Sequence, residues 1–364
     1  MSMEDVDELH AGERVSFIPE FIERADHLDK LNDTRNDDDS DAEEDETVDD
    51  TGKAEYLSKC SELGLTPVSQ VLKYLEQDDM HVAHYGLGVR GATALAEALR
   101  VNPNLVTLRL ADNHLGGEGC RIICNALVNS VLMKEIDLSE NHLGGTDGAK
   151  ARVAIAQLLT SKTCNLQTLH LRSNKLGDHD AITLAAALGE NRSVTLLDIS
   201  HNNICEKGGL AFGSLLHTGT KLRELNLGWN KIRAKGAAFI AEGLKANSLV
   251  EVVNLGWNGL GDDGLTHIGE TLANSTSLVE VILSCNGAGT RGAVALAEGI
   301  KVNESLASLE VDSNNVNEEG GEALKAAVLE NKGLVSIKLD NTNTSDNLRF
   351  SVADILKERR AAAA

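Results

Sequence analysis

The 364-residue chain is predicted to fold as an α/β solenoid, in which about ten strand-and-helix repeats stack side by side. Three observations support this. A short motif recurs along the chain after about residue 80, and most copies end on an asparagine. Successive asparagines are 28 residues apart, with one interval of 33. Between the copies, apolar residues recur at helical spacing. A fixed period of this length is typical of repeat architectures.

The motif is clearest in Leu225–Asn230, which reads Leu-Asn-Leu-Gly-Trp-Asn, and in Val253–Asn258, which differs only at its first residue. Both fit L-x-x-L-x-L-x-x-N-x-L, the leucine-rich repeat signature. One step before the first asparagine lies Tyr85, and one step after the last lies Thr342; both are in frame but lack the asparagine. Such degenerate ends are expected, because a terminal repeat faces solvent or a cap on one side. The eight in-frame asparagines are Asn113, Asn141, Asn174, Asn202, Asn230, Asn258, Asn286 and Asn314.

Each residue class in the repeat has a physical role. The L-x-L pair is predicted to be a short strand, with its leucines in the core and the intervening residue facing outward. The asparagine side chain can bond backbone groups that stacking would otherwise bury unpaired. Apolar residues such as Leu265, Ile268 and Leu272 give the following segment a helical apolar face. The prediction is a horseshoe with parallel strands on the concave side and helices on the convex side.

Residues 1–52 are predicted to be an acidic, extended tail. Residues 1–55 hold 21 acidic and 5 basic side chains, a net charge of −16 out of −22 for the chain. Self-repulsion and the scarcity of apolar residues between 26 and 51 argue against a packed structure. That stretch is a solubilising linker, an acidic contact for a basic partner, or a phosphorylation substrate through Ser40 and Thr47.

An apolar pattern precedes the acidic stretch. It is either part of a disordered tail or a short segment that docks on a partner or on the solenoid itself. Its residues are Phe17, Ile18, Phe21 and Ile22.

Residues 53–79 are predicted to be a helical N-terminal cap of two short helices, separated at Thr66-Pro67. The solenoid is predicted over residues 80–344. Its irregular interval places five extra residues within 144–165, which are either a tolerated loop insertion or a contact loop on one rim. Residues 345–364 are predicted to be a C-terminal capping helix and tail.

Composition and motifs exclude several functions. The acidic balance disfavours nucleic acid and anionic membrane surfaces as partners. No apolar run is long enough to span a bilayer, and the N-terminal residues do not read as a signal peptide. The six cysteines follow no zinc or disulfide framework, and Cys120 and Cys124 are expected to be buried apolar residues. No phosphate-binding loop or catalytic constellation is present, so no enzyme activity, cofactor or metal is expected.

The candidate binding surface lies on the predicted concave face around Trp229 and Trp257. Both occupy the same motif position in adjacent repeats, which places them about 5 Å apart. Either each ring covers the strand-to-loop corner and packs on its neighbour, or the pair is an aromatic anchor for a partner. In the second interpretation the rim of the site is formed by His201, Glu224, Asn226, Asn254 and Glu280.

The 28-residue period with a full helix resembles the ribonuclease-inhibitor-like class of leucine-rich repeat proteins. Within that class the chain is most similar to the leucine-rich-repeat-containing 74 family, over roughly residues 54–350. The acidic N-terminal run matches no motif of that family. The resemblance implies an intracellular solenoid without enzymatic activity, in a group linked to testis and ciliated cells. It rests on Tyr56-Leu57, Cys60, Gly64–Ser69, His84–Gly91, Asp198–Asn202 and Leu227–Asn230.

The expected function is therefore a non-enzymatic protein–protein interaction scaffold. The lack of a signal peptide and of a membrane-spanning run predicts a cytoplasmic or nuclear location. The resemblance favours a larger assembly such as a ciliary or flagellar axoneme, with axonemal or tubulin-associated partners. The alternative is a GTPase-activating protein of the Ran-activator type, although those proteins carry their acidic tract after the repeats. A third interpretation, an inhibitor or sensor module, fits less well because the residues predicted to face the concave side have mixed charge.

Overall fold

The computed structural model describes residues 51–363. Residues 1–50 lie outside this range, and with them the predicted docking segment of Phe17, Ile18, Phe21 and Ile22, as well as Ser40 and Thr47. Within the described residues, strands and helices alternate along the chain after two initial helices. The strands are Asp79–His81 (β1), Thr107–Arg109 (β2), Glu135–Asp137 (β3), Thr168–His170 (β4), Leu196–Asp198 (β5), Glu224–Asn226 (β6), Val252–Asn254 (β7), Glu280–Ile282 (β8), Ser308–Glu310 (β9) and Ser336–Lys338 (β10). The helices are Lys53–Leu63 (α1), Ser69–Tyr74 (α2), Gly88–Val101 (α3), Gly116–Leu127 (α4), Gly148–Thr160 (α5), Asp178–Glu190 (α6), Glu206–Thr218 (α7), Arg233–Ala246 (α8), Gly261–Asn274 (α9), Thr290–Val302 (α10), Asn317–Glu330 (α11) and Asp346–Ala363 (α12).

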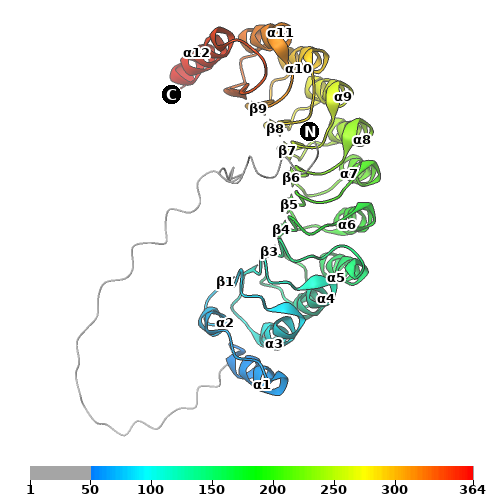
Figure 1. The fold of residues 1–364 in the computed structure, drawn as a ribbon, viewed down its shortest axis with the longest axis vertical. Coiled ribbons are helices and arrows are strands. Elements are labelled where there is room, and N and C mark those ends of the chain that lie inside the picture. The colour runs from blue at the N-terminus through cyan, green and yellow to red at the C-terminus, as the bar shows by residue number, and fades with distance from the viewer. Residues whose placement is uncertain (1–50, 364) are drawn as a thin grey trace, which may run out of the picture. The chain divides into compact units, whose positions relative to one another are not determined.

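The ten strands form one parallel sheet in chain order. Each strand pairs with the next in equivalent register, so that Leu225 of β6 lies opposite Val253 of β7. The strands line the inner side of the solenoid, and helices α3 to α11 line its outer side (Figure 1). The predicted α/β horseshoe of about ten repeats is confirmed.

The hydrophobic core lies between the sheet and the helices. In the repeat of β6, Leu225 and Leu227 point inward and are fully buried, and Ile240 and Leu244 of α8 close the other side. Burial of one such side chain stabilises the fold by about 1.5–3 kcal/mol. Since no single coil can bury both of its apolar surfaces, this stabilisation depends on stacking.

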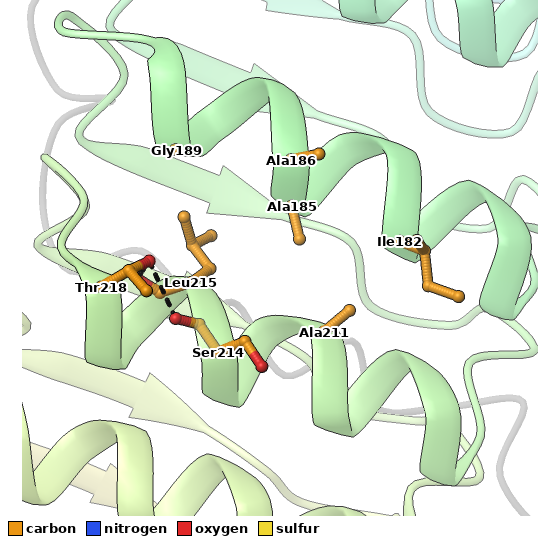
Figure 2. Close-up of a pocket in the computed structure, with 8 residues that line it drawn as sticks. All are labelled: Ile182, Ala185, Ala186, Gly189, Ala211, Ser214, Leu215 and Thr218. Atoms are coloured by element: carbon orange, nitrogen blue, oxygen red, sulfur yellow. Dashed lines mark hydrogen bonds between the residues drawn. The ribbon is translucent and has the colours of Figure 1, made fainter.

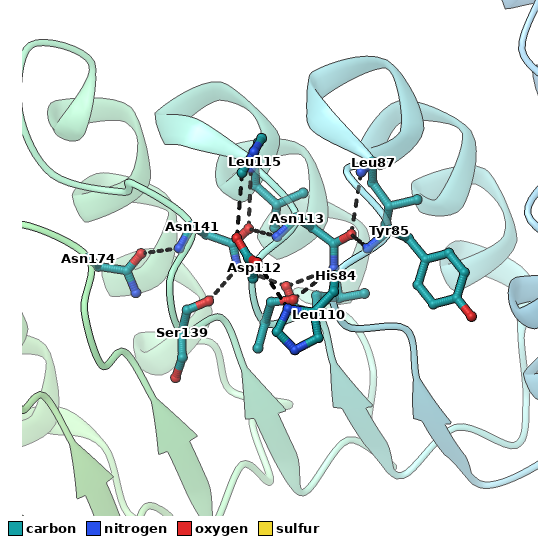
Figure 3. Close-up of polar contacts among 12 residues, drawn as sticks. His84, Tyr85, Leu87, Leu110, Asp112, Asn113, Leu115, Ser139, Asn141 and Asn174 are labelled. Atoms are coloured by element: carbon teal, nitrogen blue, oxygen red, sulfur yellow. Dashed lines mark hydrogen bonds and ion pairs between the residues drawn. The ribbon is translucent and has the colours of Figure 1, made fainter. Parts of the chain in front are cut away.

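The in-frame asparagines form a continuous asparagine ladder through the turns that follow the strands. Figure 3 shows its first three members, Asn113, Asn141 and Asn174. At Asn141 the side-chain Nδ2 donates to the carbonyl oxygens of Leu110, Leu138 and Ser139. Its Oδ1 accepts the backbone N–H groups of Asn113 and Leu115 in the preceding coil. One buried side chain thus satisfies five backbone groups in two coils, which confirms the predicted role of this residue.

A second set of asparagines, which the sequence analysis did not identify, caps helices at their C-terminal ends. Nδ2 of Asn303 donates to the carbonyls of Leu272 and Ser275 in the preceding coil. Its Oδ1 accepts the N–H groups of Ser305 and Leu306 in its own turn. The members of this helix-end ladder are Asn102, Asn191, Asn247, Asn303 and Asn331.

The extra residues of the irregular interval lie mainly before α5. This helix begins at Gly148, seven positions after Asn141, whereas α6 begins at Asp178, four positions after Asn174. The register of β3 with β4 is unaffected. The insertion therefore lengthens one loop without interrupting the sheet.

Candidate functional site

The residue that precedes each of the ten in-frame positions, which are the eight ladder asparagines with Tyr85 and Thr342, has a left-handed backbone. These ten residues, which we call the turn column, have φ between 50° and 65°. A non-glycine residue in this conformation costs about 1–2 kcal/mol, and a bulky side chain is a rare occupant. Coil stacking stabilises it, since the N–H of Trp229 donates to Gly256 and that of Trp257 donates to Ser284. The turn column is His84, Asp112, Glu140, Ser173, His201, Trp229, Trp257, Cys285, Ser313 and Asn341.

Three rings of the turn column form an aromatic stack. The ring centroids of His201 and Trp229 lie 4.8 Å apart with an interplanar angle of 14°. Those of Trp229 and Trp257 lie 3.9 Å apart with an angle of 12°. Trp229 is nevertheless 43% exposed. Because its two faces are covered by the neighbouring rings, the exposed surface of Trp229 is mainly its edge.

The residues before the two tryptophans, Gly228 and Gly256, are buried and lie close to the neighbouring coil. A Cβ atom on Gly228 would lie 3.0 Å from Nδ2 of Asn254. A Cβ atom on Gly256 would lie 3.3 Å from the carbonyl oxygen of Ser284. The repeated Gly-Trp-Asn sequence therefore combines a glycine, where a side chain would crowd the neighbouring coil, with an indole that is exposed at Trp229.

Two primary amides lie on the sheet beside the stack. Oδ1 of Asn226 accepts the N–H of Gly228 at 3.0 Å, and Oδ1 of Asn254 accepts that of Gly256 at 2.9 Å. Neither Nδ2 group has an acceptor within residues 51–363, although Asn226 is only 6% exposed. Both amides are donors that a bound molecule can use.

Two carboxylates lie further along the same inner surface. Glu224 and Glu280 are half-buried, and the strand register places Val252 between them. Burial, and after it the neighbouring Glu251, raises the pKa of Glu224. Burial and the neighbouring Glu310 raise the pKa of Glu280. Among the described residues neither carboxylate forms a salt bridge.

His201 behaves as a neutral aromatic ring. Burial lowers its pKa to about 4, with a smaller effect from the positive charge of Arg172. At neutral pH the imidazole is therefore uncharged, which suits stacking against an indole. The sequence pattern placed His201 at this site but gave no indication that Arg172 would influence it.

All seven predicted site residues of the concave face lie on the inner side of four consecutive coils, from β5 to β8. His201, Trp229 and Trp257 form the stack, Asn226 and Asn254 flank it, and Glu224 and Glu280 lie nearer the start of the strands. We call these seven residues the concave site. Their role in binding stays a prediction.

Outside the concave site, we examined the described residues for metal clusters, reactive cysteines and membrane-spanning helices. Within residues 51–363, no group of three or more His, Cys, Asp or Glu side chains is placed to hold a metal ion. Cys120 and Cys124 are buried with their Sγ atoms 3.9 Å apart, and both thiols are free. No helix in the described range has the length and apolar character needed to cross a bilayer.

The outer side has an apolar cavity of about 310 Å³ between α6 and α7 (Figure 2). Its only side-chain polar groups belong to Ser214 and Thr218, and the Thr218 hydroxyl donates to the Ser214 carbonyl within the helix. The cavity therefore lacks the oriented polar groups that would select a ligand. It is lined by Ile182, Ala185, Ala186, Gly189, Ala211, Ser214, Leu215 and Thr218.

A family model described as "Leucine Rich repeat" matches residues 101–124, 162–185, 190–213, 220–241, 246–269 and 302–325. Among solved structures, the chain is similar to the leucine-rich repeat-containing protein LegL7 from Legionella pneumophila, at 17% identity and a TM-score of 0.49, covering 82% of this chain and 96% of that one. It is also similar to a chain of the yeast Rad7–Elc1 complex, at 15% identity and 0.43, covering 72% and 69%. A third is the tropomodulin C-terminal domain of Caenorhabditis elegans, at 16% and 0.37, covering 43% and 95%. The chain is a leucine-rich repeat protein.

Proposed function

We propose that this protein is a non-enzymatic scaffold that binds a partner protein at the concave site. The observation that carries the proposal is the His201–Trp229–Trp257 stack, in which an indole held on a left-handed backbone keeps 43% of its surface exposed. Tryptophan is enriched at binding hot spots. A ring already fixed by two neighbours loses little conformational freedom on binding, which favours affinity.

Packing alone is a poorer account of the two tryptophans. The same turn position is filled by Asp, Glu, Ser and Cys in other coils, so the fold does not need an aromatic residue there. A side chain that served only to cover the turn would gain most by being buried. Trp229 instead leaves its edge in water beside two unused amide donors.

The setting of this scaffold is part of the same proposal. The resemblance to the leucine-rich-repeat-containing 74 family supports a structural component of a larger intracellular assembly such as a ciliary or flagellar axoneme. The partners would then be axonemal or tubulin-associated proteins and the location cytoplasmic. The segment of Phe17, Ile18, Phe21 and Ile22 is proposed as a second contact.

The test is affinity purification with cross-linking mass spectrometry. Wild type is compared with Trp229→Ala/Trp257→Ala and with Phe239→Ala. Phe239 is a matched control, since it is also 43% exposed but lies on α8, in the outer layer of helices. We expect the double tryptophan variant to lose a partner that the Phe239 variant keeps.

Other outcomes reassign the function. If only a deletion of residues 1–50 releases the partner, the binding site is in the tail and the tryptophans serve packing. If a small GTPase is recovered and the protein accelerates GTP hydrolysis, the Ran-activator type of function replaces the scaffold.

A further inference from the structure

Glu224 and Glu280 differ from every other acidic residue of the described strands. Asp79 and Glu135 share Arg109, with N–O distances of 3.0 and 2.9 Å. Glu310 pairs with Lys338. Asp137 and Asp198 accept the N–H groups of Ser139 and Ser200 at 2.8 and 2.9 Å. Among these residues, Glu224 and Glu280 alone have neither a cation nor a hydrogen-bond donor.

The acidic neighbours of these two carboxylates are already paired. Glu251, near Glu224, pairs with Arg223, and Glu310, near Glu280, pairs with Lys338. The negative charge without a cation on this part of the sheet is therefore that of Glu224 and Glu280 themselves. With Val252 between them, the Cα atoms of Glu224 and Glu280 are about 10 Å apart, two strand spacings. One cationic side chain placed over Val252 can therefore contact both carboxylates.

We infer that the partner segment bound at the concave site places a lysine or arginine between Glu224 and Glu280, and an apolar or aromatic side chain against the edge of the aromatic stack. This inference rests on the proposed function, because it specifies the chemistry of the partner at the same surface. Half-buried carboxylates that lack a cation gain from a charge-assisted hydrogen bond. Arginine offers the better geometry, because its planar fork has five donors.

The apolar side chain of the partner is assigned to the aromatic stack because both faces of Trp229 are already covered. Cations prefer the face of an indole ring. Both faces of Trp229 are covered, one by His201 and the other by Trp257. The exposed edge instead suits a second ring in edge-to-face contact or an aliphatic side chain. The two kinds of partner group are thereby assigned to two different parts of the concave site.

The amides of Asn226 and Asn254 lie between these two parts. Residues 224 and 226 are two apart on β6, so they share one face of the sheet. The free Nδ2 groups can donate to carbonyl oxygens of a bound backbone, which favours a polypeptide over a small cation. From residue 224 to residue 229 the chain advances by at most about 17 Å, the span of about five residues of an extended peptide. We therefore expect the basic and the apolar residues of the partner to be four to five positions apart.

The probe is a displayed library of random 12-residue peptides, panned on purified full-length chain. The chain is used as wild type, as Glu224→Gln/Glu280→Gln, and as Trp229→Ala/Trp257→Ala. Glu190→Gln/Glu330→Gln is the charge-matched control, since it removes two exposed carboxylates at the ends of α6 and α11. Circular dichroism and urea denaturation establish that each variant is folded.

We expect wild type to select peptides with a lysine or arginine four to five residues from an aromatic or aliphatic residue. Synthetic copies should bind the Glu224→Gln/Glu280→Gln variant at least tenfold more weakly, and the charge-matched control as tightly as wild type. Binding to wild type should weaken as salt is raised, as expected for exposed charges.

Two other results separate this inference from the proposed function. Peptides that depend on the tryptophans, but lack a basic residue and bind the glutamine variant normally, overturn the cationic partner and leave the scaffold standing. Selection of no peptide that distinguishes wild type from the tryptophan variant contradicts both.

Discussion

At the scale of single residues, the ladder asparagine stabilises the fold through hydrogen bonds rather than through buried apolar area. Asn141 is fully buried and bonds five backbone groups in two coils. A leucine instead contributes buried apolar area. Among the described residues the N–H groups of Asn113 and Leu115 bond only to Oδ1 of Asn141, whereas each of the three carbonyls accepts a further hydrogen bond. A buried group left unpaired costs about 1–3 kcal/mol.

Replacement of Asn141 by alanine should therefore lower the free energy of unfolding by about 3 kcal/mol or more. Asn203→Ala is the control, because Asn203 is exposed and its side chain only accepts a bond from Lys231. That change should stay within about 0.5 kcal/mol of wild type. Urea denaturation followed by circular dichroism measures both. Similar losses in the two variants would show that the ladder is not a principal source of stability.

The stacked histidine makes stability depend on pH. The unfolded chain binds a proton at His201 below about pH 6.5, whereas the folded chain binds it only below about pH 4. Between these values protonation favours the unfolded chain, so stability is complete above pH 6.5 and is lost as pH falls toward 4. Allowing for partial solvent contact of the ring, we expect a loss of about 1–2 kcal/mol from this residue.

The measurement is urea denaturation at pH 7 and at pH 4.5, on wild type and on His201→Asn. The variant should lose less stability between the two pH values than wild type does. An identical pH dependence would mean that the imidazole is protonated equally in the folded and unfolded chains.

At the scale of elements, neighbouring helices are not evenly packed. A Cβ atom on Gly213 of α7 would lie 2.3 Å from the carbonyl oxygen of Phe239 in α8. One on Gly299 of α10 would lie 2.1 Å from the carbonyl oxygen of Gly269 in α9. Between α6 and α7, by contrast, there is room for the outer cavity. Glycines thus allow the close approach of α7 to α8 and of α9 to α10.

Gly213→Ala should accordingly destabilise the protein by about 2 kcal/mol or more, because its methyl group meets backbone that cannot move aside. Gly189→Ala in α6 is the matched control. There the nearest atom to a Cβ is Leu215 Cδ1 at 3.8 Å, an ordinary contact. Alanine in a helix is favoured over glycine by about 0.5–1 kcal/mol, so this change should stabilise. Urea denaturation measures the stability of both variants. If the denaturation midpoints of the two variants shifted in the same direction, the proposed difference in helix packing would be contradicted.

The sequence predicts some of these features and not others for a physical reason. The motif fixes the strands, because a shift of one residue would turn Leu225 and Leu227 to solvent. It fixes the ladder, because the asparagines are buried at equivalent positions in adjacent coils. A 28-residue period, however, is compatible with any helix spacing, so the contact of Gly213 with α8 is invisible in it. The helix-end ladder carries the same period and could have been found from Asn303 and Asn331.

The sequence likewise predicts some features of the concave site and not others. Periodicity predicts that Trp229 and Trp257 are neighbours in adjacent coils and that Glu224 lies on the same face of the sheet. Both predictions follow from the strand register alone. It cannot give the left-handed backbone, the ring angles or the depressed pKa of His201, which depend on the path of the turn and on burial. Nor can it reveal which carboxylates lack a cation, because Arg109 and Lys338 find their acidic neighbours only through the register of adjacent strands.

At the scale of the whole described solenoid, the ends limit stability. Every interior coil is covered on two sides, but the last repeat is covered on its far side only by α12. This helix buries Leu348, Val352 and Leu356. Its Arg359 donates to the carbonyls of Val328 and Leu334, and Arg360 donates to that of Val335. These bonds satisfy groups of the last coil that have no following repeat, so α12 acts as the missing neighbour.

Deletion of residues 345–364 should lower the free energy of unfolding by about 5 kcal/mol, the contribution of about three buried aliphatic side chains. It should also cause self-association, because Leu324 and Val328 of α11 would lose part of their cover and solenoids need a polar end. Urea denaturation and light scattering after size-exclusion chromatography measure the two effects. A deletion of residues 361–364 is the control and should change neither. If the longer deletion stays monomeric with an unchanged urea midpoint, the last repeat is stable without a cap. The ladders and the sheet would then be sufficient to end the solenoid.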